Sequence, residues 1–279
     1  MSRRACVIGH PVSHSRSPLI HGYWLREYKI DGEYVREDVP PAAVGNFLDR
    51  LGEIYVGANV TIPHKEAAFA KLKHPDPVAR ALGAANTLWF ENGVLSGTNT
   101  DAHGFLAHLD ASLPGWDRRT ETALVLGAGG ASRSIVYALL ERGVARVVIA
   151  NRSPARAEAL AEHFGPGVAV ADLASISRAL AATDILVNAT SLGMKGQPPL
   201  ELDLAPLKKT ATVYDIVYVP LETPLLAAAR ARGHPVVDGV GMLLHQAVPG
   251  FERWFGVRPQ VTPALRKLLL ADLGEKERP

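Results

Sequence analysis

A lysine and an aspartate each follow a predicted strand in the N-terminal part of the chain. Lys65 lies in the run Asn59–Glu66, and Asp101 ends the run Asn99–Asp101. A carbonyl that accepts hydride needs a neighbour that stabilises or protonates the new alkoxide, and an ammonium oriented by a carboxylate can do this. The pair therefore predicts acid–base chemistry at a carbonyl or hydroxyl group. The simpler alternatives are a surface lysine and an aspartate that only caps a helix.

Hydroxyl and amide side chains gather around the same strand ends. Residues 9–18 carry three serines between the first predicted strand and a helix, and Asn59 and Thr61 end a later strand. Open α/β sheets bind their ligands at the carboxyl ends of the strands. We therefore expect a small polar ligand at this edge.

A glycine-rich turn in the second half of the chain predicts a dinucleotide site. Residues 127–133, with the sequence GAGGASR, lie between the apolar strand 123–126 and a helix. Glycines at such a turn let the backbone approach a pyrophosphate, whose charge meets the free N–H groups of the helix N-terminus. Glycine also serves close packing in α/β proteins, but its place directly after a buried strand favours the cofactor.

The end of the next predicted strand indicates which dinucleotide binds. NAD-binding folds usually place an aspartate or glutamate there, on the ribose 2′-hydroxyl. This chain has Asn151, Arg152 and Ser153, followed one turn later by Arg156, and no carboxylate. Arginine and serine can hold a 2′-phosphate that a carboxylate would repel. We therefore predict NADP(H) as the cofactor; the alternative is that the two arginines merely begin a solvated helix.

Short apolar strands alternate with helices along nearly the whole chain, a pattern typical of α/β proteins. In the N-terminal part we expect strands at 6–8, 33–39, 54–61, 87–90 and 94–98. We also expect four helices there: one that opens with Ser17 as N-cap, one at 42–51, and two that begin at residues 63 and 101. From residue 122 the pattern restarts, with strands at 123–126, 146–150, 184–188, 213–217 and 235–237, and helices to about 143 and at 154–164, 242–255 and 262–273.

This restart predicts two domains. Residues 1–101 should form a mixed α/β substrate-binding and catalytic domain, mixed because Asn92-Gly93 is a hairpin turn. Residues 102–238 should form a Rossmann-type, doubly wound NADP domain. The C-terminal segment 239–279 should fold back on the first domain, apart from a disordered polar tail at Glu275–Pro279.

Composition argues against several other classes of protein. The 279 residues include one cysteine, and the formal net charge is +2, with basic and acidic residues interspersed. Without a basic stripe we expect no nucleic-acid partner, and no run approaches the roughly 20 apolar residues of a membrane span. Cys6 should lie in a buried strand, and a single thiol fits a reducing, cytoplasmic location. No HExxH or CxxC motif occurs, so no metal site is expected.

Together the motifs resemble those of the shikimate dehydrogenase family, over nearly the whole chain. Nine segments match in order, namely Ser15–Pro18, Gly57–Glu66, Gly83–Thr87, Asn99–Asp101, Gly127–Arg133, Asn151–Arg152, Asn188–Met194, Tyr214–Tyr218 and Gln246–Ala247. The chain departs from the family at Thr98, Ala102 and Val219, where aspartate, glycine and asparagine are frequent. These departures bear on substrate range and loop geometry rather than on the type of reaction.

The resemblance implies an enzyme that reduces 3-dehydroshikimate to shikimate with NADPH, in aromatic amino-acid biosynthesis. Lys65 and Asp101 would be the catalytic pair. The substrate carboxylate would contact Ser15, Ser17 and Tyr218. Thr61, Asn86 and Gln246 would contact the ring hydroxyls or support the catalytic pair. Besides Ser153 and Arg156 at the strand end, NADP(H) would be surrounded by Gly127, Ala128, Gly129, Gly130, Ala131, Asn151, Arg152, Thr190, Ser191, Met194, Gly239 and Met242.

Three alternatives stay open beside this reading. One is a broader quinate/shikimate dehydrogenase that uses NAD, against which Arg152 argues. Another is a different two-domain NADP enzyme, such as a methylenetetrahydrofolate dehydrogenase, which has no reason to carry the serine pair. A third is a non-catalytic ligand sensor on the same fold, which would not need both Lys65 and Asp101. The expected partners are a small-molecule substrate and at most a second copy, as a monomer or homodimer.

Overall fold

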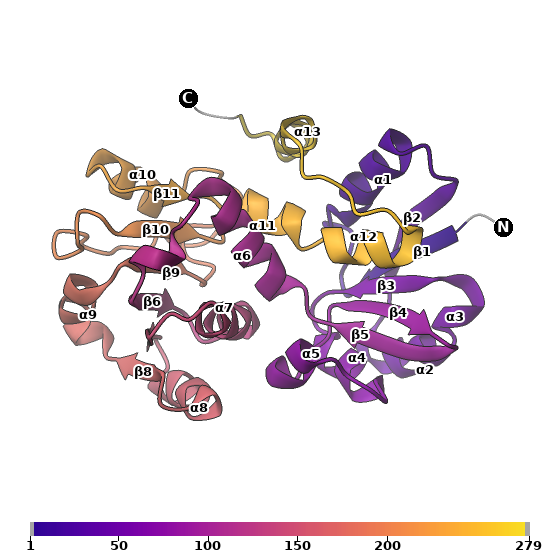
Figure 1. Cartoon of the computed structure of the whole chain (residues 1–279), viewed down its shortest axis with the longest axis horizontal. Helices are drawn as coiled ribbons and strands as arrows, with labels where there is room; N and C mark the ends of the chain where they lie inside the picture. The colour runs from indigo at the N-terminus through magenta and orange to yellow at the C-terminus, as the bar shows by residue number, and fades with distance from the viewer. Residues whose placement is uncertain (1–2, 277–279) are drawn as a thin grey trace. The chain divides into compact units, whose positions relative to one another are not determined.

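The computed structural model describes residues 3–276, which form two compact α/β units (Figure 1). Within these residues the first unit runs to Gly104 and resumes over Leu244–Asp272. The second unit covers Phe105–Leu243 and resumes at Leu273. The predicted α/β class, with one mixed sheet and one Rossmann-type sheet, is confirmed. Residues 277–279 of the expected polar tail lie outside the described part of the chain.

The first unit is built on a five-stranded mixed sheet in the order β2-β1-β3-β4-β5. Its strands are β1 (Arg3–Gly9), β2 (Gly32–Asp38), β3 (Gly57–Val60), β4 (Thr87–Glu91) and β5 (Val94–Thr98). The first three are parallel, and β4 and β5 form an antiparallel hairpin. Its turn residues Asn92 and Gly93 have φ angles of 51° and 76°, a region that these two residue types tolerate. The carboxyl ends of β1 and β3 therefore meet at one edge.

Helices cover both faces of this sheet (Figure 1). One face carries α2 (Val44–Asp49), α3 (Leu51–Ile54), α4 (Lys65–Lys71) and α5 (Pro77–Leu82). These helices bury alternate strand residues such as Cys6, Ile8 and Val60 in one apolar core. The other face carries α1 (Ser17–Glu27) and α12 (Val248–Phe255). Because successive strand residues face opposite sides, each strand contributes to both layers.

The C-terminal segment consists of α11 (Val240–His245), α12 and α13 (Pro263–Leu273). Of these helices, α12 packs on the sheet of the first unit. Trp254 Nε1 donates to the carbonyl of Leu88 over 2.8 Å, and a Cβ on Gly57 would lie 2.1 Å from the same nitrogen. Trp24 Nε1 of α1 donates to the carbonyl of Gln260 over 2.9 Å. The indole of α12 thus lies directly on the backbone of β3.

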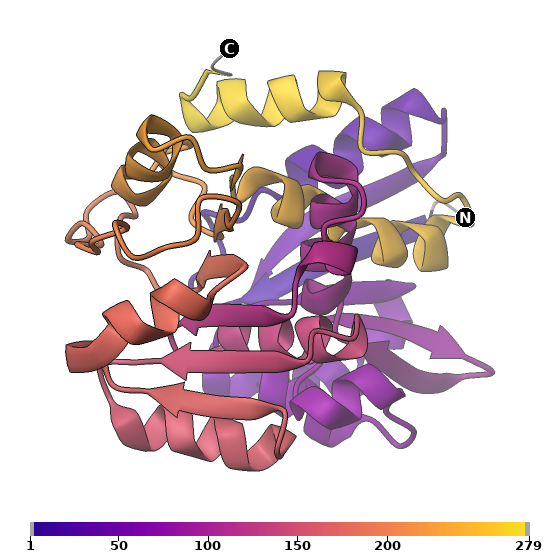
Figure 2. The ribbon, with the colours of Figure 1, turned by 60° about the vertical axis from the view of Figure 1, so that its left-hand side comes forward.

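The second unit is built on six parallel strands in the order β11-β10-β9-β6-β7-β8. They are β6 (Thr122–Leu126), β7 (Arg146–Ala150), β8 (Val168–Ala171), β9 (Ile185–Asn188), β10 (Thr212–Asp215) and β11 (Val236–Val237). Figure 2 shows neighbouring strands of this sheet pointing the same way. The order is that of the doubly wound dinucleotide-binding fold, whose direction of winding reverses between β6 and β9.

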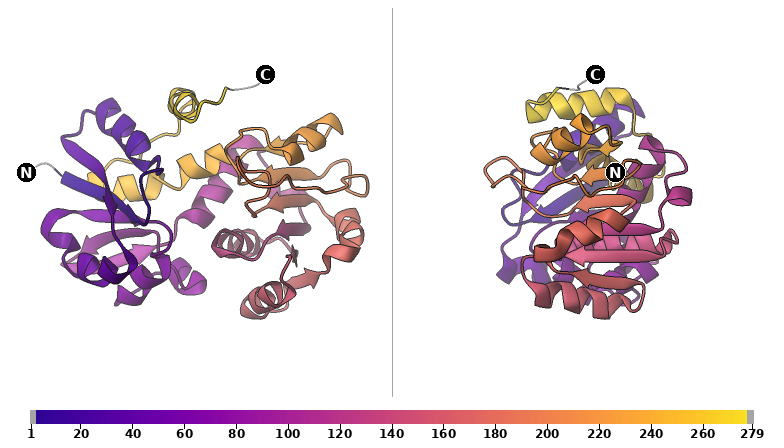
Figure 3. Two further views of the ribbon diagram at one scale, coloured as in Figure 1. Left: turned by 180° about the vertical axis from the view of Figure 1, so that it is seen from behind. Right: turned by 90° about the vertical axis from the view of Figure 1, so that its left-hand side faces the viewer.

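Helices lie on both faces of the second sheet as well (Figure 3). One face is covered by α7 (Gly130–Glu141) and α8 (Pro154–Phe164), and the other by α9 (Ile176–Ala182) and α10 (Pro224–Ala231). The latter pair packs on an apolar core that includes Leu124, Leu186 and Val213. Strands covered on both faces are largely apolar, and in β6 every residue after Thr122 is apolar.

Several local predictions differ from the structure. The predicted strand 54–61 is shorter, because Leu51–Ile54 form α3, and the helix expected from Pro63 begins at Lys65. The N-cap prediction at Ser17 is wrong. Arg16 takes that position without a side-chain cap, and the Ser17 backbone N–H donates to Ser15 Oγ over 3.3 Å. The sequence pattern also does not predict α5, β8, α9 or α10.

Candidate active site

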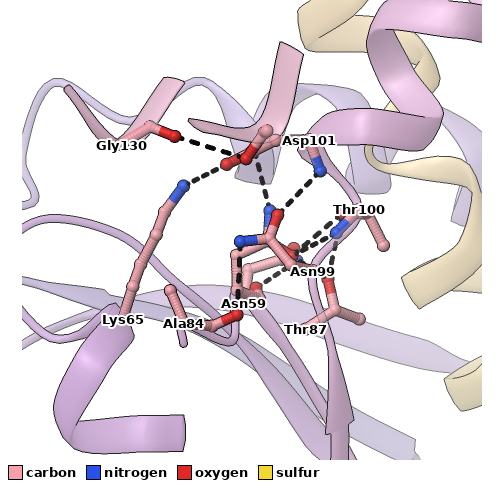
Figure 4. Close-up of polar contacts among 10 residues, drawn as sticks. Asn59, Lys65, Ala84, Thr87, Asn99, Thr100, Asp101 and Gly130 are labelled. Carbon is pink, nitrogen blue, oxygen red and sulfur yellow. Dashed lines mark hydrogen bonds and ion pairs between the residues drawn. The ribbon is translucent and has the colours of Figure 1, made fainter. Parts of the chain in front are cut away.

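Lys65 and Asp101, from two different strand ends, form an ion pair in the first unit (Figure 4). Nζ of the lysine lies 2.5 Å from Oδ2 of the aspartate. Each is the first residue of a helix, Lys65 of α4 and Asp101 of α6 (Asp101–Ser112). The Asp101 side chain is 9% exposed and the Lys65 side chain 29%, so the carboxylate is buried and the ammonium reaches solvent. An ammonium has three hydrogens, and those that do not face Asp101 can be donated to a ligand.

Asn86 orients the carboxylate of this pair. Its Nδ2 donates to Asp101 Oδ1 over 2.8 Å. Its Oδ1 accepts from the backbone N–H of Thr100 at 2.8 Å and from Thr87 Oγ1 at 3.0 Å. The Asp101 backbone N–H in turn donates to Asn99 Oδ1 at 3.0 Å. Because two donors face Oδ1 of the buried Asn86, the amide has one orientation, with Nδ2 directed at Asp101.

A further layer of hydrogen bonds connects this cluster to β2. Asn59 Nδ2 donates to the carbonyl of Asn86 and to Thr87 Oγ1, at 3.2 and 3.1 Å, while its Oδ1 accepts from Tyr34 Oη at 2.6 Å. The Tyr34 ring stacks on His21 with centroids 4.0 Å apart. Burial raises the pKa of Tyr34 well above its usual range and lowers that of His21 to about 3, so both rings are neutral at pH 7. The sequence does not reveal Tyr34, because its partner lies 25 residues away.

Of the serines predicted to bind a carboxylate, Ser15 lies between β1 and α1, and Ser17 is the first residue of α1. Ser15 Oγ donates to Ser17 Oγ over 3.3 Å, and Arg36 Nη2 donates to the Ser15 carbonyl at 2.6 Å. Thr61 follows β3, and a Cβ on Gly9 would lie 2.4 Å from its methyl carbon. Only glycine fits at position 9, so the chain leaving β1 passes directly beside Thr61. The predicted hydroxyl groups of the first unit are thus brought to one sheet edge.

The glycine-rich turn joins β6 to α7 in the second unit. Gly127 has φ of 108°, which favours glycine, and a Cβ there would lie 3.1 Å from the carbonyl of Ala189. A Cβ on Gly129 or Gly130 would meet nothing within 4 Å. The backbone at the start of the twelve-residue helix α7 is therefore accessible, as a pyrophosphate site requires. Ala128 lies in this turn, and Ala131 is the second residue of α7.

The predicted 2′-phosphate residues follow β7 at the start of α8. Asn151 Nδ2 donates to the carbonyl of Ser153 over 2.9 Å, which closes the turn. The side chains of Arg152, Ser153 and Arg156 are exposed. Neither arginine forms an ion pair within residues 3–276. Two guanidinium groups that face no carboxylate in this part of the chain suit a phosphate monoester.

Asn188, the last residue of β9, shapes the loop that follows it. Its Oδ1 accepts from the backbone N–H and from Oγ1 of Thr190, at 3.1 and 2.7 Å, and its Nδ2 donates to Asp215 Oδ1 at 2.9 Å. Ser191 and Met194 are exposed on this loop. A methionine beside a polar turn offers an adaptable apolar surface to a flat ring.

The remaining predicted residues lie near the ends of β10 and β11 and in the C-terminal helices. A Cβ on Gly239 would lie 2.2 Å from the backbone carbonyl two residues before Tyr218, so the two segments are in close backbone contact. Met242 lies in α11 and is buried. Gln246 is half-buried in the link between α11 and α12. Burial lowers the pKa of the preceding His245 to about 4, so this imidazole is neutral at pH 7.

Other kinds of site find no support in residues 3–276. This part of the chain contains no group of three or more metal-ligating side chains. None of the helices formed by these residues has the length and apolar character of a membrane span. Cys6 is buried in β1, as predicted, and burial raises the pKa of its thiol.

A Rossmann-type unit with an accessible glycine turn, together with a unit that carries a lysine–aspartate pair, defines a dinucleotide-dependent dehydrogenase. Three family models match the chain. They are described as the shikimate dehydrogenase substrate binding domain, over residues 7–88, shikimate/quinate 5-dehydrogenase, over 111–194, and the shikimate 5′-dehydrogenase C-terminal domain, over 239–269. The chain belongs to the shikimate dehydrogenase family.

Similar proteins cover almost the whole chain. The curated shikimate dehydrogenase (NADP(+)) of Azorhizobium caulinodans is 60% identical over 98% of both chains. Among solved structures, quinate dehydrogenase from Corynebacterium glutamicum in complex with NAD aligns with a TM-score of 0.89 and 33% identity, over 97% of this chain and 99% of that one. Shikimate 5-dehydrogenase from Thermus thermophilus in complex with NADP(H) and shikimate aligns with a TM-score of 0.86 and 36% identity, over the same shares.

Proposed function

We propose that this chain catalyses the reversible reduction of 3-dehydroshikimate to shikimate with NADPH, a step of aromatic amino-acid biosynthesis. The observation that carries the proposal is the Lys65–Asp101 pair, with Nζ and Oδ2 2.5 Å apart. Reduction of a ring ketone creates an alkoxide, and a cation fixed beforehand stabilises that charge without reorganisation. A sensor that only binds its ligand has no need of such a pair.

Lys65 stabilises the developing alkoxide and supplies its proton. Asp101 orients the ammonium, and Asn86 fixes the carboxylate through the 2.8 Å hydrogen bond to Oδ1. The carboxylate also accepts a hydrogen bond from a neighbouring ring hydroxyl of the substrate. This route needs no covalent intermediate.

NADP(H) fits the second unit, and when bound it supplies the hydride. The open backbone at Gly129 and Gly130 receives the pyrophosphate, and Arg152 and Arg156 pair with the 2′-phosphate. The other residues that we assign to the cofactor are Gly127, Ala128, Ala131, Asn151, Ser153, Thr190, Ser191, Met194, Gly239 and Met242.

Substrate recognition is assigned to polar side chains from several strand ends. The carboxylate accepts hydrogen bonds from Ser15, Ser17 and Tyr218. The ring hydroxyls contact Thr61, Asn86 and Gln246. In this assignment most substrate contacts come from residues 1–101 and 239–279, and most cofactor contacts come from residues 102–238. The lone, buried Cys6 supports a cytoplasmic location, and we expect a monomer or homodimer.

Activity on quinate with NAD is the second candidate. The likeness to a quinate dehydrogenase solved with NAD favours it. The exposed Arg152, in place of a strand-end carboxylate, favours NADP and thereby the first candidate.

One set of assays separates these activities. Purified protein is given shikimate or quinate with NADP+ or NAD+, and the rise of the reduced-nicotinamide absorbance is followed. We expect the highest kcat/KM for shikimate with NADP+. A higher value for quinate with NAD+ would move the assignment to the second candidate, and no turnover in any combination would leave only a ligand-binding role.

The role of Lys65 is tested by Lys65→Ala, with Lys71→Ala as the control in the same helix. Lys71 pairs with Asp49 on the surface, at 2.7 Å. We expect Lys65→Ala to lower kcat roughly 10²- to 10⁴-fold and to change KM much less, because the charge that it meets develops in the transition state. Lys71→Ala should keep both constants. A loss that lies in KM alone would remove Lys65 from the chemical step.

A further inference from the structure

Asp215 is a fully buried carboxylate that forms no ion pair with the rest of residues 3–276. It is the last residue of β10. Its Oδ1 accepts from Asn188 Nδ2 at 2.9 Å and from the backbone N–H of Val217 at 3.0 Å, and its Oδ2 accepts from Thr223 Oγ1 at 2.7 Å. Three neutral donors therefore surround one buried negative charge.

The three donors belong to three separate segments. Asn188 ends β9, Val217 directly precedes Tyr218, and Thr223 is the N-cap of α10, where its Oγ1 also accepts from the backbone N–H of Leu226. All three segments lie at the carboxyl-end edge of the second sheet, where dinucleotide-binding folds hold their ligands. One side chain thus connects the segment of Tyr218 to the loop that follows β9.

Asn188 passes this constraint on to the loop. Its Nδ2 also donates to the carbonyl of Leu192 over 3.2 Å, while Oδ1 accepts twice from Thr190. The amide of Asn188 has one acceptor atom, Oδ1, and one donor group, Nδ2. Because Asp215 and Leu192 accept from Nδ2, Oδ1 must face the donors of Thr190. A hydrogen-bond donor at position 215 would oppose that orientation.

The charge itself does not favour the fold. Burial raises the pKa of Asp215 from the ordinary 3.8 to about 6, against the opposing hydrogen bonds of Thr223, Val217 and Asn188. The folded state therefore binds this proton more tightly than the unfolded state, and ionisation lowers stability as pH rises through that interval. A neutral side chain of the same shape would cost the fold less desolvation. Its role is therefore sought in the three segments that it connects.

We propose that Asp215 is a positioning residue whose carboxylate holds the Thr190–Met194 loop and the Tyr218 segment in the geometry that binds NADP(H) and substrate. The proposal rests on the function assigned above. Asp215 contacts neither the cofactor nor the substrate in this scheme, and it acts through Asn188 and Val217.

The variant Asp215→Asn tests the proposal. Asparagine keeps the shape of the side chain, but its NH₂ group places hydrogens against neighbours that are themselves hydrogen-bond donors. The control is Asp184→Asn, at the opposite end of β9. That carboxylate is 17% exposed and accepts from the backbone N–H groups of Glu121 and Thr122 and from Lys208. Binding of NADP+ is measured by calorimetry, which needs no turnover, and KM for shikimate is measured in the assay.

We expect Asp215→Asn to weaken NADP+ binding roughly tenfold to a hundredfold at pH 7.5, as buried donors lose their acceptor. KM for shikimate should also rise, because the segment that carries Tyr218 is no longer held in place. The change in kcat should be smaller than the changes in NADP+ binding and in KM. The control variant should bind NADP+ as the wild type does. Unchanged NADP+ binding in a folded Asp215→Asn protein would overturn the proposal, as would an equal loss in both variants.

A pH series separates positioning from a merely structural role. The ionisable neighbour of Asp215 in β10 is Tyr214, which burial keeps protonated by raising its pKa. Two further ionisable groups act on Tyr214, namely Asp238 through its charge and His108, whose Nδ1 lies 2.9 Å from Tyr214 Oη. Wild-type binding should weaken towards that of the variant as pH falls through about 6. The cofactor's 2′-phosphate titrates in the same range and affects both proteins, so the readout is their ratio. A constant ratio would contradict the proposal.

A second variant covers the case in which Asp215→Asn does not fold. Thr223→Val removes the donor to Oδ2 and also the acceptor that caps α10, so the midpoint of the pH step should move to higher pH. An unmoved step would refute the assignment. If the wild-type protein shows the step but does not oxidise shikimate, the proposed function fails and the positioning role stands.

Discussion

The buried side chain of His21 makes the free energy of unfolding depend on pH. It lies in α1, fully buried, stacked on Tyr34 and edge-on to Trp24 with centroids 5.7 Å apart. Burial lowers its pKa from 6.5 to about 3, and neither ring nitrogen has a hydrogen-bond partner within residues 3–276. Protonation of His21 therefore lowers the stability of the folded state.

The sign and size follow from linkage. Between about pH 3 and pH 6.5 the unfolded chain holds a proton on His21 that the folded chain does not, so stability rises with pH in this window and is lost as pH falls. Each pH unit inside the window is worth about 1.4 kcal/mol. Between pH 7 and pH 5 the folded state should lose about 2 kcal/mol through this residue alone.

The assay compares wild type with His21→Phe, which keeps an aromatic ring and removes the titrating group. Urea unfolding is followed by tryptophan fluorescence, to which Trp24 and Trp254 of the first unit contribute directly beside position 21. Between pH 7 and pH 5 the free energy of unfolding of the wild type should fall by about 2 kcal/mol relative to that of the variant. Contributions from Asp215 cancel in this difference. His74→Gln, an exposed position, should leave the slope unchanged. Parallel curves for wild type and His21→Phe would refute the reasoning.

Two further predictions concern the cofactor site. Gly127→Ala places a Cβ 3.1 Å from the carbonyl of Ala189 at φ of 108°. We therefore expect urea unfolding to show a stability loss of roughly 1–3 kcal/mol and calorimetry to show weaker NADP+ binding. The control Gly129→Ala, whose Cβ meets open space, should bind NADP+ more nearly as the wild type does, and the reverse order of affinities would contradict the argument. Arg152→Ala should weaken NADP+ binding roughly tenfold or more and leave NAD+ binding nearly unchanged, since only NADP+ carries the 2′-phosphate. Equal losses for both cofactors would remove Arg152 from phosphate recognition.

Local signals in the sequence account for most of the fold. The strand predicted at 146–150 and the helix at 154–164 coincide with β7 and α8. Both begin and end with clear signals, including Pro154 in the first turn of the helix. The missed elements are short. β8 has four residues at the sheet edge and α5 has six, and such runs are too brief to display a period.

The site was predictable in its residue types but not in its hydrogen bonds. Strand ends predict where polar groups gather, and Lys65 and Asp101 follow from that rule. The partners that orient them come from strand register. Asn188 and Asp215 are 27 residues apart and lie side by side because β9 and β10 pair in that register. Register depends on packing and turn geometry across the whole sheet, which sequence spacing does not encode.

The contact between the Trp254 indole and the backbone of β3 has a consequence for folding during translation. The first unit contains the earliest and nearly the latest residues of the chain, whereas the second unit is almost continuous in sequence. As the polypeptide leaves the ribosome, the six parallel strands can assemble while one face of the earlier sheet still lacks α12. The sheet that is translated first therefore receives α12 only after all six strands of the second sheet have been translated.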